Sequence, residues 1–437
     1  SGHPGSTDRL LTVAQLRYLR EVELPQALLR SSELRGRYIQ FAKTAPTARR
    51  IVQDPLNGLE NSLKVRRKQL DALLEEALMN QKIRDESALR AQVAAAPELK
   101  TIGDPSSDIE KAVATQRDLP LEASYIEGAA GFNSRLFRFA RTLVRAAAER
   151  EKANGERLRE FTDAALPRVR QTLAAPVPLY PELERLTLSF GLERMREWLG
   201  PDHPQVRATV AKDSPDSLAE ALVGGTKLAD PAVRLALWDG GRAAIDASTD
   251  PMIKLARETD ATARAIRKRV EDEVEAPINR AEEKIARARF KLYGTQVYPD
   301  ATFTLRLNYG TVQAWKEKGV QLSPYTRLGT AFARATGQAP FRIPDSFERV
   351  KEKLDLDTPV NLSTNNDIVG GNSGSALLNA RGDVVGLMFD GNIHSISGAY
   401  WFDTVKNRST AVHPAIMREA LSKVYGANTI LAELERR

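Results

Sequence analysis

The feature that most constrains the fold is the helical spacing of apolar residues from about Leu11 to Leu292. It is clearest where Ile266, Val270, Val274, Ile278 and Ile285 recur at intervals of four or seven, with Arg, Lys and Glu between them. The same pattern occurs earlier, in "RLFRFARTLVRAAAERE", at Leu136, Phe139, Leu143 and Val144. This spacing places apolar side chains on one face of a helix. Proline-rich joints interrupt it, so we predict a large domain of many separate helices.

Beyond Leu292 the period of the apolar residues changes from helical to alternating. In "ATFTLRLNYG", Phe303, Leu305 and Leu307 alternate with polar residues, which predicts a half-buried strand. "SALLN" and "DVVGLMF" read as two further strands joined by "ARGD", and the chain closes with an amphipathic helix that stops at Gly426. The sequence therefore predicts an α+β fold, with a large all-helical domain followed by about 150 β-rich residues.

Composition excludes several classes of function. The net charge is +7, but Lys and Arg alternate with Asp and Glu, as in "RAEEKIARAR", which is typical of solvated helix faces rather than a nucleic-acid interface. The chain has no cysteine, so it can form neither disulfides nor thiolate metal sites, and it has no H-E-x-x-H motif. No apolar run approaches the roughly 18 residues of a membrane span. We expect no metal, no other cofactor, no nucleic-acid partner and no membrane span.

The first residues, "SGHPGSTDRLLTVAQLRYL", resemble neither a signal peptide nor a natural start. Gly2, Pro4 and Gly5 predict a turn, and Thr7 or Asp8 could cap a helix that begins near Leu11. The stretch reads as the middle of a longer protein. We therefore expect the chain to be a fragment, a proteolytic product or one part of a nicked enzyme.

The segment with the most chemical content is "NDIVGGNSGSALLNARGDVVGLMFDGN", residues 366–392, in which a Gly-Asn-Ser-Gly turn separates two apolar runs. A serine hydroxyl becomes a useful nucleophile only beside a base and a site for the developing oxyanion. Flanking glycines allow the amides of Gly371 and Ser373 to converge on one point, and Gly374 leaves room for a substrate chain. The alternative is an ordinary hairpin turn. The strand pair that follows favours a nucleophile at Ser373.

This segment is similar to the nucleophile region of the bacterial dipeptidyl peptidase 7 and 11 family, serine exopeptidases of the chymotrypsin clan. "GHPGSTDR", "YPDATFTLRLNYGTV", "LDLDTPVNLSTNND" and "RSTAVHPAIMREALSKVYGA" also resemble that family. The resemblance implies a helical domain that caps a chymotrypsin-like double β-barrel. It assigns residues 1–10 to the end of the first barrel segment, 11–292 to the helical cap and 293–437 to the C-terminal barrel segment. Ala376 stands where the family usually has proline, with no obvious catalytic cost.

The same resemblance implies that the catalytic histidine and aspartate lie before the segment similar to "GHPGSTDR", in an N-terminal part that this chain lacks. The alternative is that one of its own four histidines acts as the base. His3 and His413 occur beside prolines in turn-like contexts, His203 lies in a helix joint, and His394 follows Ser373 by 21 residues. None of these contexts indicates a catalytic base.

An enzyme that removes dipeptides must hold the free α-ammonium of its substrate, and a carboxylate does this best. By resemblance, Asp390 in "FDGN" is that carboxylate, although a turn-forming Asp is the plain alternative. The family adds an asparagine in an Asn-x-x-Lys setting, which here is Asn61, with Asn57 close by. The residue after the aspartate lines the pocket for the side chain before the cut. It is Gly391 here, where an arginine would favour acidic substrates. Gly391 predicts an open, uncharged pocket for hydrophobic side chains, as in the dipeptidyl peptidase 7 branch.

Three functions remain open on the sequence. The first is the serine dipeptidyl peptidase, acting on peptides with a free N-terminus together with the N-terminal part of the same enzyme. The second is a chymotrypsin-fold endopeptidase, and the third is a non-catalytic helical interaction protein with a decayed peptidase barrel. The resemblance also implies a homodimer in the periplasm or at the cell surface of a Gram-negative-type bacterium.

Overall fold

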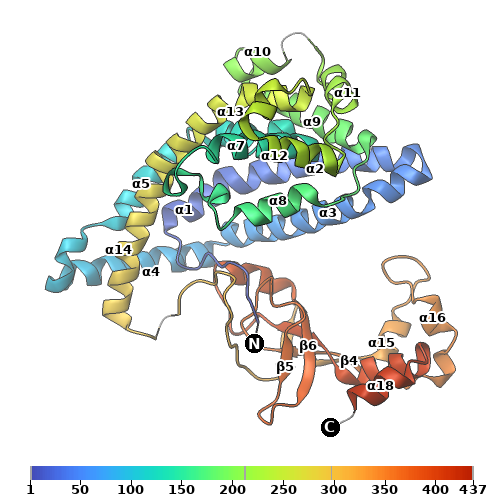
Figure 1. Ribbon diagram of the computed structural model, residues 1–437. Coiled ribbons are helices and arrows are strands. Elements are labelled where there is room, and N and C mark those ends of the chain that lie inside the picture. Colours follow the sequence, from blue (N-terminus) through green and yellow to red (C-terminus); the bar gives the residue numbers. More distant parts are fainter. Residues whose placement is uncertain (1, 211–212, 297, 436–437) are drawn as a thin grey trace. The chain divides into compact units, whose positions relative to one another are not determined.

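The computed structural model describes residues 2–210, 213–296 and 298–435 (Figure 1). The chain divides into two compact units. One is helical and contains residues 12–67 and 85–292. The other contains the sheet and consists of residues 1–11, 68–84 and 293–437. The predicted α+β class is confirmed, with helices through most of the chain and short antiparallel strands after residue 314.

The first helices are α1 (Val13–Tyr18), α2 (Leu24–Thr44), α3 (Pro46–Leu74) and α4 (Glu76–Ala95), of which α3 and α4 extend into residues 68–84 of the sheet unit. Helix α1 begins at a capping box in which Thr12 accepts from the amide of Gln15 and the Gln15 side chain accepts from the amide of Thr12. The prediction that Thr7 or Asp8 caps this helix is wrong. The Thr7 hydroxyl instead donates to Asp300, at 2.5 Å.

Several of the remaining helices of the helical unit begin with a capping residue followed by a proline. Asp104, Ser214, Asp230 and Asp250 each accept a hydrogen bond from a backbone amide in the first turn. These caps, each followed by a proline, fix the first residue of four helices. The helices are α5 (Pro105–Gln116), α7 (Arg135–Glu149), α8 (Leu166–Ala174), α9 (Pro181–Leu199), α10 (Pro204–Val210), α11 (Pro215–Gly225), α12 (Pro231–Ala247), α13 (Pro251–Val270) and α14 (Ala276–Tyr293).

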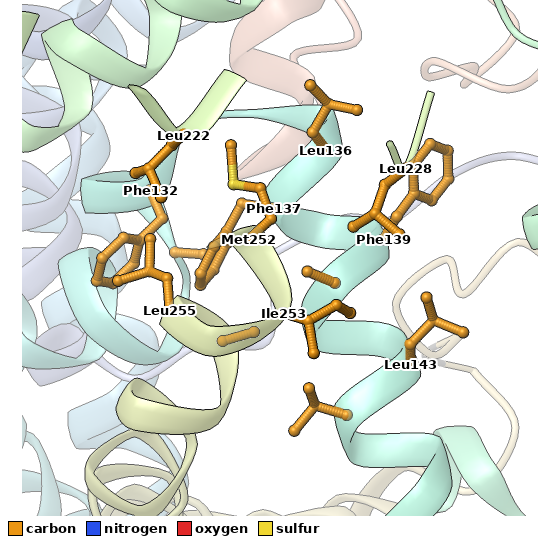
Figure 2. Close-up of a cluster of buried hydrophobic side chains, with 14 of the residues drawn as sticks. Phe132, Leu136, Phe137, Phe139, Leu143, Leu222, Leu228, Met252, Ile253 and Leu255 are labelled. Atoms are coloured by element: carbon orange, nitrogen blue, oxygen red, sulfur yellow. The ribbon is translucent and has the colours of Figure 1, made fainter. Parts of the chain in front are cut away.

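The main hydrophobic core lies in the helical unit, where α7 packs against α12 and α13, and α9 packs against α11. Figure 2 shows Phe132, Phe137 and Leu143 among the buried side chains of this core. The rings of Phe132 and Phe137 are stacked with their centroids 4.5 Å apart. The four apolar positions predicted from "RLFRFARTLVRAAAERE" are all buried, which confirms the helical reading of that segment.

The sheet unit contains a five-stranded antiparallel sheet in the order β3-β4-β7-β6-β5 and a two-stranded hairpin, β1-β2. The predicted pair "SALLN" and "DVVGLMF" is confirmed as β5 and β6, with Ala376 opposite Leu387 and Leu377 opposite Gly386. The strands are β1 (Trp315–Glu317), β2 (Val320–Leu322), β3 (Tyr325–Arg327), β4 (Pro359–Thr364), β5 (Ala376–Leu378), β6 (Val384–Gly391) and β7 (Ser409–Val412).

The predicted half-buried strand in "ATFTLRLNYG" is wrong. This segment makes only isolated bridges, from Thr302 to Ser6 and from Arg306 to Gly2. Phe303 has a positive φ of 60°, which breaks a regular strand. The three apolar residues that alternate here, Phe303, Leu305 and Leu307, are exposed rather than half-buried.

The chain closes as predicted, with helix α17 (Pro414–Glu419) and, after Gly426, helix α18 (Asn428–Leu434). Gly426 has a φ of 63°, the left-handed conformation that ends a helix and that glycine adopts without steric cost. Two short helices, α15 (Leu328–Ala333) and α16 (Asp345–Glu348), lie between β3 and β4. No helix of the described ranges is both long and apolar enough to cross a membrane.

Candidate active site

The Gly-Asn-Ser-Gly turn lies between β4 and β5 and is fixed to the neighbouring strand β6. The Gly374 amide donates to the carbonyl of Met388 at 2.7 Å, and the Met388 amide donates to the carbonyl of Ser375 at 2.9 Å. Asn372 is buried and donates from both its backbone and its side chain to the carbonyl of Val369. The turn is therefore a specified structure, held from both sides by hydrogen bonds.

Two positions in this turn have backbone conformations that favour glycine. The φ angles are 105° at Gly371 and 85° at Gly374. At Gly371 a Cβ atom would also lie 2.5 Å from the carbonyl oxygen of His3. A side chain at this position would thus be strained by its backbone and would clash with the N-terminal segment.

Ser373 is exposed at the tip of the turn, and its hydroxyl donates to the carbonyl of Phe389 at 3.3 Å. The amides of Gly371 and Ser373 donate to no acceptor among the described residues. Two neighbouring amides without a partner are what an oxyanion hole requires. The arrangement can present a hydroxyl and two free donors to a substrate carbonyl.

The N-terminal segment packs directly on the turn. The Gly5 amide donates to the carbonyl of Gly370 at 2.6 Å, and the Phe303 amide donates to the carbonyl of Gly5 at 3.0 Å. A Cβ on Gly2 would lie 2.1 Å from the Ser375 hydroxyl oxygen. The N-terminal segment and the turn therefore lie so close together that a side chain at residue 2 would clash with Ser375. Residues from the beginning of the chain therefore form one wall behind the nucleophile turn.

Arg9 links this N-terminal segment to both sides of the site. Its guanidinium makes a bidentate contact with Asp367, six residues before Ser373, and its Nε donates to the carbonyl of Gly398 at 2.8 Å. The hydroxyl of Tyr298 also donates to Asp367, at 2.9 Å. Burial alone would lower the pKa of Arg9, but the hydrogen bond and charge of Asp367 outweigh it, so the pKa is raised. This ion pair fixes the segment that leads into the turn.

Asp390 lies in β6, directly after the residue whose carbonyl accepts from Ser373. Its side chain is exposed, and Oδ1 accepts from the Gly391 amide at 2.8 Å. Among the described residues it forms no ion pair. The structure thus places the Ser373 hydroxyl against the backbone of the residue before Asp390, whose carboxylate has no cationic partner among the described residues.

Gly391 pairs with Ser409 of β7, and the space beside it is already filled. A Cβ at this position would lie 2.2 Å from the Ser395 hydroxyl oxygen and 2.6 Å from the Ser395 Cβ. An arginine at residue 391 would therefore require Ser395 to move. The role of Gly391 as the pocket selector stays a prediction, but the room expected beside it is occupied by Ser395.

Asn61 is exposed on α3 and belongs to the helical unit, whereas Asp390 belongs to the sheet unit. The pairing of these two residues in amine binding therefore stays a prediction. The alternative, Asn57, lies one turn earlier, and its side-chain oxygen accepts from Gln53 at 2.8 Å. Asn61 has no such partner among the described residues, which favours it over Asn57.

None of the four histidines hydrogen bonds to the hydroxyl of Ser373. The ring of His3 is exposed and lies 6.1 Å from that of Phe303, centroid to centroid. His203 contacts Glu122 at 3.0 Å and His394 contacts Glu317 at 2.7 Å. His413 accepts from the Ala415 amide, and burial lowers its pKa.

No group of His, Asp or Glu side chains in residues 2–210, 213–296 and 298–435 is arranged to hold a metal ion. The chemistry available at this site is that of a serine hydroxyl, backbone amides and a carboxylate. Such a set suits covalent acyl transfer.

Comparison with known proteins identifies the family. The profile of the Peptidase S46 family matches residues 1–436, so this chain belongs to the Peptidase S46 family.

Curated relatives carry two kinds of name. The chain is 28% identical over 250 residues to an Asp/Glu-specific dipeptidyl-peptidase of Shewanella putrefaciens, a match that covers 49% of this chain and 34% of that protein. It is 37% identical over 151 residues to a dipeptidyl-peptidase 7 of Capnocytophaga gingivalis, covering 32% of this chain and 21% of that protein. The matched parts span about a third or less of these relatives, and the two names differ in specificity.

The crystal structure of Porphyromonas endodontalis DPP11 in complex with the dipeptide Arg-Glu has the same fold. It superposes with a TM-score of 0.77 at 18% sequence identity, over all of this chain and 64% of that chain. At this identity the match establishes the fold alone.

Sequence reasoning named Ser373, Gly371 and Asp390, whose roles stay predictions, and it missed the ion pair of Arg9 with Asp367. These residues are 358 positions apart, and both occur in segments that resemble the family. Only that shared resemblance singled out both segments, and nothing in either one predicts the contact.

Proposed function

We propose that this chain forms the nucleophile-bearing part of a serine dipeptidyl peptidase that releases dipeptides from free N-termini. One observation carries the proposal. Ser373 is exposed, its own amide and that of Gly371 have no acceptor within the described residues, and its hydroxyl donates to the carbonyl of Phe389, just before the exposed carboxylate of Asp390. A nucleophile and a fixed anion this close suit a substrate whose ammonium lies two residues before the scissile bond.

In the proposed reaction the Ser373 oxygen attacks the carbonyl carbon of the second residue, and its proton passes to a base. The developing oxyanion accepts hydrogen bonds from the amides of Gly371 and Ser373. The leaving amine takes a proton, and water then releases the dipeptide from the acyl-enzyme. Asp390 holds the substrate ammonium, and Asn61 adds a neutral acceptor. Because none of the histidines at positions 3, 203, 394 and 413 contacts the Ser373 hydroxyl, we propose that the base comes from another part of the enzyme.

We further propose that the side chain before the cut is hydrophobic. Gly391 provides no charge, and Arg408, whose carbonyl would contact a Cβ there, is 3% exposed. The Arg408 guanidinium is buried and gives four of its five N–H donors to the carbonyls of Ala314, Thr404 and Asn407, so its charge is already engaged by the backbone. An acidic side chain would lose hydration without gaining a cation. Because some relatives are named as specific for Asp and Glu, the experiment must also test for a preference for acidic side chains.

The experiment uses the complete enzyme and dipeptidyl reporters that end in Leu or Asp, each with a free or an acetylated amine. We expect cleavage only of free-amine reporters, with a higher kcat/KM for Leu than for Asp. Ser373→Ala should lower kcat by about 10⁴-fold or more at an unchanged melting temperature, because the nucleophile is lost while the exposed turn stays intact. Equal cleavage of acetylated reporters would indicate an endopeptidase. Normal activity of Ser373→Ala would exclude this serine, and a preference for Asp would exclude Gly391 as the selector.

By the same resemblance, we propose that the enzyme acts as a homodimer in the periplasm or at the cell surface. Gel filtration of the complete enzyme and fractionation of its cells would test these two points separately from its activity.

A further inference from the structure

A cavity of about 330 Å³ lies in the helical unit, in addition to the candidate active site of the sheet unit. Its volume is in the lower range of small-molecule sites in proteins. Aromatic, aliphatic and cationic side chains share its wall. They include Tyr18, Arg30, Arg66, Tyr125, Trp198 and Val274.

Three π-helical turns meet at this cavity. They are Leu19–Glu23, Ala123–Glu127 and Glu271–Glu275, and each contributes at least one residue to the wall. A π turn widens the backbone helix by one residue and is less stable than regular α-helix, and such turns occur frequently at functional sites. Their meeting at a single cavity indicates that its shape is specified by the backbone.

The two arginines of the wall lack carboxylate partners. Arg30 donates to the Ser124 hydroxyl at 3.2 Å, and Arg66 donates to the Ser31 hydroxyl at 3.3 Å. Neither forms an ion pair within the described parts of the chain, although many arginines of the same unit do. Glu23 is the single carboxylate among the lining residues and is exposed. Two cations against one carboxylate leave the wall with a net charge of +1.

The two guanidinium groups also act on each other. Burial lowers the pKa of Arg30 most, Tyr125 acts in the opposite direction, and the nearby positive charge of Arg66 lowers the pKa by a smaller amount. Arginine nevertheless stays protonated in proteins, so both charges persist. A bound anion would offset this repulsion and use the planar donors of both groups.

We propose that this cavity binds a small organic monoanion, a carboxylate with an aromatic or branched aliphatic body. The body lies against Tyr18, Tyr125 and Trp198, and the carboxylate pairs with Arg30 and Arg66. The net charge of +1 matches a carboxylate better than a phosphate dianion. The apolar wall favours a ligand that buries carbon as well as charge.

The test uses the purified 437-residue chain and two isosteric probes, 3-phenylpropionate and its uncharged amide, 3-phenylpropanamide. Calorimetric titration should show binding of the acid at least about tenfold tighter than of the amide, since a charged hydrogen bond is lost in the amide. Binding should also change the fluorescence of the chain through Trp198. Arg66→Gln should weaken binding of the acid about tenfold, and Arg66→Lys should weaken it less. Arg67→Gln removes the same charge from an exposed neighbour on α3 and should leave binding unchanged.

Several results would overturn the proposal. They are no binding of the acid at millimolar concentration, equal binding of acid and amide, or equal losses in Arg66→Gln and Arg67→Gln. If inorganic phosphate displaced 3-phenylpropionate as effectively as another organic carboxylate does, the cavity would not be a site for organic monoanions. Circular dichroism and melting temperature establish that each variant is folded. Arg66→Lys keeps the test decisive if Arg66→Gln does not fold.

Discussion

The two units of this protein differ in how much of their apolar side chains they expose. In the helical unit the large side chains of the core are sequestered, with Phe137 and Leu143 each 1% exposed. In the sheet unit the apolar residues of one segment face outward, with Leu305, Leu307 and Tyr309 exposed by 67%, 79% and 90%. Exposed apolar side chains that gather in one segment are typical of a site that contacts another surface. The helical unit therefore buries its large apolar side chains, whereas this segment of the sheet unit leaves them exposed.

The difference extends to polar residues. In the helical unit, Arg145 is buried and pairs with both Glu127 and Asp260. In the sheet unit, Ser373 and Asp390 are exposed, and Asp390 forms no ion pair among the described residues. We therefore expect substitutions of buried residues in the helical unit to change stability, and substitutions of exposed residues near Ser373 to change activity.

The largest effect should come from the core of the helical unit. Leu143→Ala should lower the free energy of unfolding by about 2–5 kcal/mol, because it removes buried methyl groups and leaves a cavity. Leu307→Ala, the same chemical change at an exposed position of the sheet unit, should change it by less than about 0.5 kcal/mol. Denaturant titration of both variants measures the contrast. A similar cost for Leu307→Ala would show that its side chain is covered in solution.

Asp390→Ala should affect function without affecting stability. We expect kcat/KM of the complete enzyme on free-amine reporters to fall by about 10²-fold, equivalent to about 2.7 kcal/mol, because the substrate ammonium loses its charged partner. Asp383→Ala, at the other end of the β5–β6 pair, is the matched control and should retain full activity. Asn61→Ala should cause a smaller loss of about tenfold if the helical unit takes part in amine binding. Unchanged kinetics of Asn61→Ala would confine amine recognition to the sheet unit.

The Arg9–Asp367 pair is where stability and function meet in the sheet unit. Arg9→Ala should cost about 1–3 kcal/mol of stability, discounted because both side chains are partly exposed, and should leave Asp367 without its cation. Because Asp367 leads into the nucleophile turn, kcat should fall more than KM changes. Arg9→Lys should restore part of kcat. An Arg9→Ala variant that is less stable but fully active would show that the pair supports the fold only.

The sequence predicted features that depend on a few consecutive residues, and it did not predict contacts between distant segments. Local patterns predicted the helices, the strands β5 and β6 and the turn at Ser373, because each depends on spacing or on glycine conformation over a few residues. The alternation around Leu305 predicted burial and failed, since alternation cannot specify a partner for the strand. The Arg9–Asp367 pair and the filling of the space beside Gly391 by Ser395 depend on contacts between separate segments. No pattern within one segment encodes them.

The smallest effect compares two histidines that share a local motif. His203 and His413 each precede a proline, and in each the ring nitrogen Nδ1 accepts from the amide two residues later, at 3.1 Å. The other nitrogen of His203 in the helical unit contacts Glu122, whereas burial lowers the pKa of His413 in the sheet unit below its usual value of 6.5.

A proton on His413 would remove the acceptor that caps α17. The unfolded chain therefore binds this proton more readily than the folded protein, so stability due to His413 is complete above pH 6.5 and is lost as the pH falls below it. We expect a loss of about 1 kcal/mol or less, the usual worth of an N-cap. His413→Asn, which keeps a capping oxygen, should flatten the fall in stability between about pH 7.5 and 5.5, the range in which histidine titrates. His203→Asn should leave that fall in place. Denaturant titration at several pH values measures both slopes, and an undiminished slope in His413→Asn would show that the acid sensitivity arises at other groups.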